Sequence, residues 1–94
     1  MGSADTLSRV FKIKNKLGLH ARAAAMFVRL SNKFSSDIKL IKDGYEVNGK
    51  SILGILSLAA IQGTELSIVA IGKDAGEALS EIGKLIESGF GEEM

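Results

Sequence analysis

The hydrophobic residues of this 94-residue chain switch between the two-residue spacing of β-strands and the 3.6-residue spacing of α-helices. Residues 8–14 alternate, with Phe11 and Ile13 on one side and lysines on the other, which predicts a half-buried strand. Residues 21–33 predict an alanine-rich helix. Its apolar side comprises Ala23, Phe27, Leu30 and Phe34. Short segments of both kinds are typical of a domain in which helices cover a sheet.

A hairpin and a further strand are predicted in the middle of the chain. Residues 37–42 and 45–48 have the composition of strands. Asp43 and Gly44 lie between them and form a strong two-residue turn signal, because both positions tolerate a positive φ. Residues 65–71 are rich in isoleucine, leucine and valine, and they predict a fourth strand.

Two more helices are predicted from capping residues. Ser51 is placed to cap a short helix with its hydroxyl. Asp74 and Glu77 have the spacing of a capping box at the start of a last helix, and Gly89 is placed to end that helix. The apolar stripe of the last helix comprises Ala75, Ala78, Leu79, Ile82 and Ile86.

The order strand, helix, strand, strand, helix, strand, helix (βαββαβα) predicts the fold class. We expect an α/β (α+β) open-faced two-layer sandwich, in which three helices cover one face of a four-stranded, largely antiparallel sheet. A chain of 94 residues is long enough for one domain with a modest core. We expect a single domain over residues 1–94, with its core at about residues 8–89 and short flexible termini.

Composition excludes several classes of site. The chain has no cysteine and one histidine, so a disulfide, a thiolate nucleophile and a multi-histidine metal site are excluded. We expect no metal and no cofactor. A net charge of +1, with one tyrosine and four phenylalanines, does not favour a nucleic-acid partner. The longest apolar run, residues 23–28, is too short to span a membrane. The first residues lack the apolar stretch of a signal peptide. We therefore expect a cytoplasmic protein without membrane insertion.

His20 lies between a glycine-containing loop and the predicted start of a helix. The first-turn amides of Ala21, Arg22 and Ala23 have no partners within a helix and carry partial positive charge, so they form an anion-binding helix start. The Arg22 guanidinium can donate two parallel hydrogen bonds to a phosphate. Because neutral imidazole is also a nucleophile, this segment suggests a phosphoryl acceptor. The alternative is a histidine that only caps the helix or lies on the surface.

The segment Lys50–Gly54 is the second candidate. A capping serine followed by a core helix explains most of it, but apolar residues occur on two sides of this short helix. Ile52 and Leu56 belong to one stripe, whereas Leu53 lies on another side. A short helix on a single sheet cannot easily bury both, so we infer an exposed apolar docking patch. Complete burial under a loop is the competing interpretation.

A basic helix face accompanies these two segments. It comprises Arg22, Arg29 and Lys33. Charges of this kind are usually solvated, and they can also attract an acidic partner and raise the rate of association.

Two motifs resemble those of one protein family. Residues 18–22, Gly-Leu-His-Ala-Arg, closely resemble the phosphorylation motif of HPr, the histidine-containing phosphocarrier of the bacterial phosphoenolpyruvate-dependent sugar phosphotransferase system. Residues 50–54, Lys-Ser-Ile-Leu-Gly, resemble the regulatory-serine motif of the same family. The spacing between the motifs and the element order also match, so the resemblance covers about residues 8–89.

The resemblance implies a phosphorelay. His20 would accept a phosphoryl group on its δ1 nitrogen from enzyme I, itself charged by phosphoenolpyruvate, and donate it to sugar-specific IIA proteins or domains, with Arg22 assisting. Ser51 would be the target of an ATP-dependent HPr kinase/phosphorylase, with a transcriptional regulator as a further partner. The shared docking surface would comprise Ile52, Leu53, Leu56 and Arg29. Such a chain would be a monomeric carrier and a covalent intermediate of phosphoryl transfer, and not a complete enzyme.

Ala23 departs from the family pattern, since it occupies the position at which the family usually carries proline. Proline fixes φ and removes an N–H, whereas alanine restores a first-turn donor and is a good helix former. We expect the site to be retained with a different rigidity, so the change bears on transfer rate and partner preference. Two other functions stay open. One is a nitrogen-related paralogue whose output is regulation, and the other is an interaction module switched at Ser51 in which His20 is idle.

Overall fold

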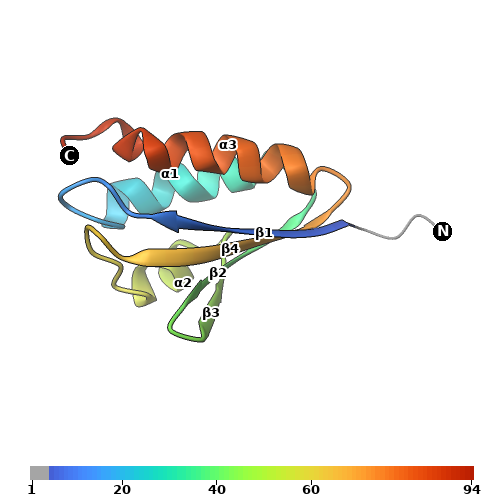
Figure 1. Ribbon diagram of the computed structural model, residues 1–94, viewed down its shortest axis with the longest axis horizontal. Coiled ribbons are helices and arrows are strands. Elements are labelled where there is room, and N and C mark those ends of the chain that lie inside the picture. Colours follow the sequence, from blue (N-terminus) through green and yellow to red (C-terminus); the bar gives the residue numbers. More distant parts are fainter. Residues whose placement is uncertain (1–4) are drawn as a thin grey trace.

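The computed structural model describes residues 5–94 and contains a four-stranded antiparallel sheet covered by three α-helices (Figure 1). The strands are β1 (Asp5–Lys12), β2 (Asp37–Lys42), β3 (Tyr45–Asn48) and β4 (Glu65–Gly72). The helices are α1 (Ala21–Ser31), α2 (Ile52–Ser57) and α3 (Ala75–Glu87), and a 3₁₀ turn (Gly89–Gly91) follows α3. The predicted fold class and element order are confirmed.

The sheet has the strand order β1-β4-β2-β3, and every neighbouring pair is antiparallel. Strands β4 and β2 occupy the centre, and their buried residues point toward the helices at every second position, as in the paired Leu40 and Ile68. Helix α3 packs on β1 and β4, while α1 contacts both α2 and α3. This packing places the start of α1 at one end of the helical layer.

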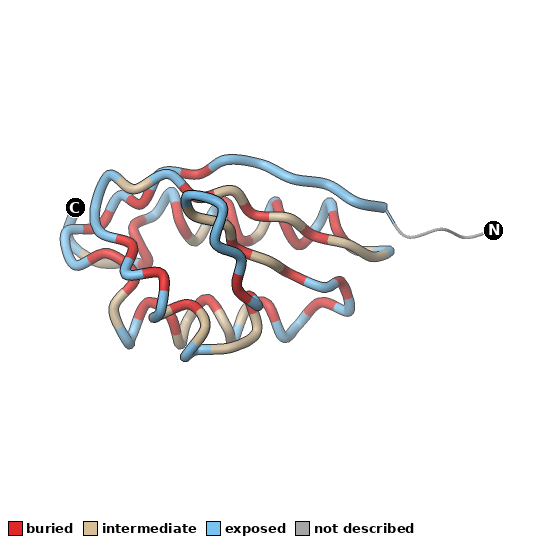
Figure 2. Tube along the Cα trace, turned by 90° about the horizontal axis from the view of Figure 1, so that it is seen from below, coloured by how far each residue is buried: buried red, intermediate tan, exposed pale blue. Residues whose placement is uncertain are grey.

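Strand β1 differs in its bounds from the prediction of residues 8–14. It begins at Asp5 and ends at Lys12, and within it only Phe11 is buried, as the almost continuous exposed trace in Figure 2 shows. Ile13 is buried beyond the strand end, where its amide donates to the carbonyl of Thr64 at 2.9 Å. The part of the predicted flexible N-terminus at residues 1–4 lies outside the described residues.

The predicted hairpin turn is confirmed in its backbone conformation. Asp43 and Gly44 have φ values of 50° and 81°, so both central residues are left-handed, as a two-residue turn between twisted strands requires. Helix α1 ends at Ser31, before the predicted residue 33, and it buries Ala23 and Phe27 as predicted.

The predicted capping box at α3 is wrong. Asp74 does precede the helix, but its side chain makes no capping hydrogen bond to α3. Its carboxylate instead accepts hydrogen bonds from the amides of Ser35 at 2.9 Å and Ser36 at 3.0 Å, and from the Ser36 hydroxyl. These bonds, led by the Ser36 hydroxyl, lower the pKa of Asp74 to about 2. Through these hydrogen bonds, Asp74 connects the start of α3 to the segment before β2.

The segment after α3 is packed against the domain. Gly89 has a φ of 65°, which confirms its predicted role in ending the helix. Phe90 is buried, so the packed part of the chain extends past the predicted limit at about residue 89. In Figure 1 the end of this segment and the loop before α1 lie at the same end of the molecule. None of the helices within residues 5–94 is long and apolar enough to cross a bilayer.

Candidate functional site

His20 is the N-cap residue of α1. Its backbone is extended, with φ −77° and ψ 179°, and its carbonyl accepts the first helical hydrogen bond from Ala24 at 2.8 Å. Its Nδ1 atom accepts a hydrogen bond from the backbone N–H of Arg22 at 3.4 Å. The capping role that was the alternative interpretation of His20 is therefore present in the structure. A quarter of the His20 side-chain surface stays exposed, at 25%, so the ring is also open to another molecule.

The loop before α1 holds His20 in place through its backbone. Gly18 has a φ of 67°, and a Cβ atom there would collide with the carbonyl of Ala60. The next amide, that of Leu19, donates to the same carbonyl at 2.9 Å. Glycine is therefore required at position 18 both for its conformation and for the close approach of the two loops.

A carboxylate contacts the other side of the His20 ring. The Nε2 atom lies 2.6 Å from Oε2 of Glu92, whose side chain is only 12% exposed. The other carboxylate oxygen accepts a hydrogen bond from Nδ2 of Asn15 at 2.9 Å, and this contact is the main reason why the pKa of Glu92 lies below its ordinary value. Asn15 is fully buried and also donates to the carbonyl of Gly18 at 2.9 Å.

Sequence reasoning missed both Asn15 and Glu92. Asn15 lies in the predicted glycine-containing loop before His20, and Glu92 lies in the predicted flexible C-terminal end. The available signal was weak, consisting of the Gly-Phe-Gly segment before Glu92, which can turn the chain back toward the domain. Glu92 contacts His20 from 72 positions away in the chain, and Asn15 contacts Glu92 from 77 positions away, so both contacts depend on the tertiary structure.

The three predicted anion-binding residues have different surroundings. Ala21 and Arg22 are exposed and Ala23 is buried. The Arg22 amide is used by Nδ1 of His20. Among residues 5–94 the Arg22 guanidinium has no ion-pair partner, although its positive charge contributes slightly to the lowered pKa of Glu92.

Ser51 is the N-cap residue of α2, as predicted. Its Oγ atom accepts a hydrogen bond from the amide of Gly54 at 3.0 Å. The two residues that follow are exposed, Ile52 at 40% and Leu53 at 80%. Ile55 is buried in the core and Leu56 is partly buried. An apolar surface at the start of α2 is therefore present in the structure.

Two further apolar side chains lie on loops that meet beside His20. Leu17 and Ile61 are 67% and 71% exposed, and neither was predicted as a site residue. Their loops are joined by the bond from Leu19 to Ala60. Arg29 lies elsewhere, in a depression of about 210 Å³ between α1 and α3. The residues around that depression are Met26, Arg29, Leu30, Lys33 and Leu85.

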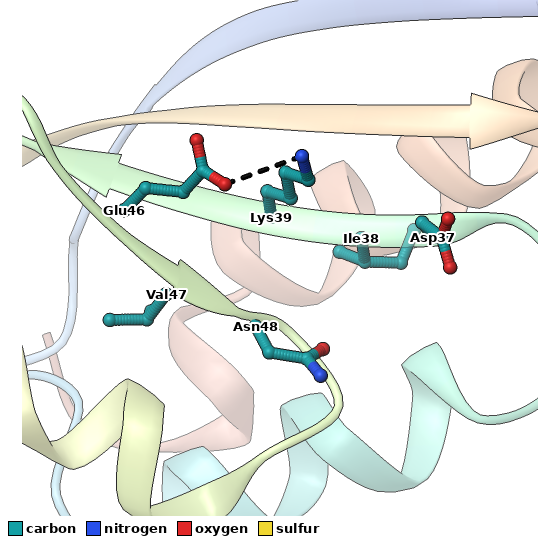
Figure 3. A pocket seen from close by; sticks show the side chains of 6 residues that line it. All are labelled: Asp37, Ile38, Lys39, Glu46, Val47 and Asn48. Atoms are coloured by element: carbon teal, nitrogen blue, oxygen red, sulfur yellow. Dashed lines mark ion pairs between the residues drawn. The ribbon is translucent and has the colours of Figure 1, made fainter.

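A pocket of about 220 Å³ lies between β2 and β3, where Lys39 and Glu46 form an ion pair at 3.3 Å (Figure 3). Its lining residues are Asp37, Ile38, Lys39, Glu46, Val47 and Asn48. None of the predicted site residues is among them, so the chemistry of His20 does not involve this pocket. The part of the chain that the structure describes has no cluster of three or more histidine, cysteine or acidic side chains placed to hold a metal ion.

The chain matches a known protein family over most of its length. The family described as "PTS HPr component phosphorylation site" matches residues 7–88. The phosphocarrier protein HPr of Treponema pallidum is 41% identical over 85 residues, which are 90% of this chain and 97% of that protein. The crystal structure of HPr from Thermoanaerobacter tengcongensis has a TM-score of 0.90 at 50% identity, and the match covers 94% of this chain and 99% of that one.

A second kind of relative is also similar. The HPr-like protein Crh of Bacillus subtilis is 46% identical over 76 residues, 81% of this chain and 89% of that protein. A crystal structure of Crh, described as a catabolite repression protein with a swapping domain in a dimer, has a TM-score of 0.73 at 44% identity and covers 84% of this chain and 91% of that one. With the family match spanning both motifs and the fold shared with HPr, the chain belongs to the HPr phosphocarrier family of the phosphotransferase system.

Proposed function

We propose that this chain carries a phosphoryl group on Nδ1 of His20, accepting it from phospho-enzyme I and delivering it to IIA proteins or domains. It acts as a cytoplasmic monomer and as a covalent intermediate, and it is not a complete enzyme. Family membership supports the phosphotransferase role, and the position of His20 supports the choice of acceptor.

The observation that carries the proposal is the environment of the His20 ring. Nδ1 faces the first turn of α1, where amide N–H groups and the Arg22 side chain favour a bound phosphoryl group. When phosphorus bonds to Nδ1, the Arg22 amide loses its acceptor there and becomes available to a phosphoryl oxygen. The guanidinium of Arg22 has no competing ion pair within residues 5–94, so it is free to reach the same group.

Docking uses the apolar surface of α2 in this proposal. Leu53 and Ile52 are large and exposed beside the cap at Ser51, which is the kind of surface that a partner protein buries. Leu56 extends the surface toward the core. Arg29 lies apart from this surface, at the depression between α1 and α3, where its positive charge would raise the rate of association with an acidic partner.

Regulation through Ser51 is the second function that we propose. A phosphate on its Oγ would add negative charge beside Ile52 and Leu53, where it would hinder docking of a partner with acidic groups. The modifying enzyme would be an HPr kinase/phosphorylase, and a transcriptional regulator would bind the phosphorylated form. The similarity to Crh, a catabolite repression protein, favours this second role.

Incubation with enzyme I and phosphoenolpyruvate tests the first function. Wild type and Ser51→Ala should both acquire acid-labile phosphate, and His20→Ala, which removes the chain's single histidine, should acquire none while remaining folded. Circular dichroism and thermal unfolding verify the fold of each variant. Acid-labile phosphate on folded His20→Ala, or none on wild type, would contradict the proposed acceptor.

A further inference from the structure

The segment after α3 holds Glu92 against His20 through several contacts of its own. The Glu92 amide donates to the carbonyl of Gly89 at 2.9 Å, and Phe90, within the same segment, is buried. The next residue, Glu93, accepts a backbone hydrogen bond from Lys16 at 3.2 Å, and the two side chains form an ion pair at 3.4 Å. Glu92 is therefore fixed on both sides along the chain, and its carboxylate is directed at the ring by the fold.

The neighbours of the His20 ring determine which nitrogen carries its proton. Nδ1 faces a backbone N–H, which can only donate, so Nδ1 must be the acceptor. Nε2 faces a carboxylate with a lowered pKa, which is ionised at neutral pH and can only accept, so Nε2 must be the donor. The two contacts lie on opposite sides of the ring and require the same tautomer, with the proton on Nε2 and the lone pair on Nδ1.

Asn15 determines the orientation of the carboxylate in the same way. Its Nδ2 atom faces two acceptors, Oε1 of Glu92 and the carbonyl of Gly18. A rotated Asn15 amide would place oxygen against both acceptors. The fully buried Asn15 therefore presents a donor to Oε1 and leaves Oε2 for His20.

We propose that Glu92, clamped by Asn15, is a positioning residue that keeps His20 in the Nε2–H tautomer and balances the charge of the ring when Nδ1 is phosphorylated. This inference rests on the proposed phosphoryl transfer to His20. It adds a role for two residues that neither the phosphorylation motif nor the helix start contains.

Phosphoryl transfer to His20 requires no proton to leave the ring, because Nδ1 attacks while Nε2 keeps its proton. The Nδ1 lone pair forms the new bond to phosphorus, and the bond from phosphorus to the atom of enzyme I that carries the phosphoryl group breaks, with its electron pair going to that atom. The His20 ring then carries a positive charge, because Nε2 keeps its proton. The Glu92 carboxylate, 2.6 Å from Nε2 and with a side chain only 12% exposed, neutralises this charge at short range. In transfer from His20, a lone pair of the next acceptor forms a bond to phosphorus, the bond from phosphorus to Nδ1 breaks, and its electron pair returns to Nδ1, so the ring is neutral again with its proton on Nε2.

Glu92→Gln and Glu92→Ala distinguish positioning from simple packing. In Glu92→Gln the clamp from Asn15 holds the amide oxygen, so the amide NH₂ group faces Nε2 and forces the proton onto Nδ1. A proton on Nδ1 removes the lone pair that attacks phosphorus, whereas Glu92→Ala only removes the contact to Nε2 and leaves both tautomers available. Glu92→Gln should therefore be slower than Glu92→Ala in accepting phosphate from enzyme I. We expect it to be slower than wild type by roughly ten- to a hundred-fold. Glu93→Gln is the matched control, because Glu93 pairs with Lys16 and has no contact with His20.

The tautomer is measured on the unphosphorylated full chain by ¹⁵N NMR of the imidazole, at an alkaline pH where a histidine ring is ordinarily neutral. His20 is the only histidine, so its signals are unambiguous. Wild type and Glu93→Gln should show the proton on Nε2, and Glu92→Gln should show it on Nδ1. A wild-type proton on Nδ1, an unchanged tautomer in Glu92→Gln, or transfer by Glu92→Gln as fast as by Glu92→Ala would overturn the proposal. Because NMR needs no enzyme I, failure of phosphorylation in wild type would contradict the proposed function separately.

Discussion

Replacement of Ser51 separates its structural role from its proposed regulatory role. The structure gives the Ser51 hydroxyl one defined contact, the hydrogen bond that it accepts from the amide of Gly54 at 3.0 Å. Ser51→Ala leaves that amide without its cap, which costs about 1 kcal/mol of unfolding free energy, within a range of roughly 0.5–2 kcal/mol. In a domain of this size such a loss lowers the melting temperature by roughly 4–8 °C. Phosphoryl transfer from enzyme I should stay close to the wild-type rate, because the substitution does not change the proposed docking surface at Ile52 and Leu53.

Ser51→Asp should have the opposite effects. Its carboxylate can accept the same hydrogen bond from Gly54 and places negative charge at the start of α2, so the unfolding free energy should be equal to or greater than that of Ser51→Ala. The charge also lies beside exposed Ile52 and Leu53, so docking of enzyme I should weaken and transfer at limiting protein concentration should slow.

Thermal unfolding and transfer kinetics of both variants, measured side by side, test this separation. Ser57→Ala is a matched control, because it makes the same chemical change on α2 at an exposed hydroxyl that donates to the carbonyl of Gly54 and does not cap the helix. If Ser51→Asp transfers as fast as wild type, or is slow only because it has unfolded, the docking interpretation is refuted. If Ser51→Ala is as stable as Ser57→Ala, the capping argument is refuted.

Two further substitutions test other parts of the structure. Arg22→Lys keeps the charge but cannot donate two parallel hydrogen bonds, so phosphoryl transfer should slow by about tenfold, which corresponds to roughly 1.4 kcal/mol. The control variant Arg9→Lys, on β1, should transfer at the wild-type rate. Equal transfer rates in Arg22→Lys and wild type would contradict the role of the guanidinium. Asp74→Asn should lower the unfolding free energy mainly above about pH 4, because folding lowers the pKa of Asp74 from its ordinary 3.8 to about 2. The carboxylate therefore contributes its full stabilisation above the ordinary pKa and loses it as the pH falls toward 2. Urea unfolding of wild type and Asp74→Asn at several pH values measures this, and a stability difference that does not shrink on acidification would contradict it.

Local patterns were sufficient to predict the fold. Alternation in the strands, the Asp43–Gly44 turn and the apolar stripe of α3 are each determined by neighbouring residues, and all three are present in the structure. The error at Asp74 shows the limit of such reasoning. Capping-box spacing is a local signal, but Ser35 and Ser36 lie about 40 positions away and together offer the carboxylate more donors than the helix does. The pattern could not include that competition.

Only the Nδ1 side of the His20 ring could be predicted from the sequence, because a single short segment forms it. His20, the first-turn amides and Arg22 are close in the chain, so helix geometry alone places Nδ1 beside the Arg22 N–H. The other side of the ring depends on a residue in the segment after α3 and on a buried loop amide, and it exists only once β1, α1 and α3 have packed together.

This division has a chemical consequence. An imidazole whose environment is fixed on one side alone can change its tautomer or rotate, whereas His20 meets a donor at Nδ1 and an acceptor at Nε2. In the proposed function, the short motif therefore supplies the nucleophile and the anion site, and the tertiary structure selects the tautomer of the ring. It follows that substitutions far from the motif in sequence, at Asn15 or Glu92, should change the chemistry of His20 more than substitutions at exposed Ala21, which is adjacent to it in the chain.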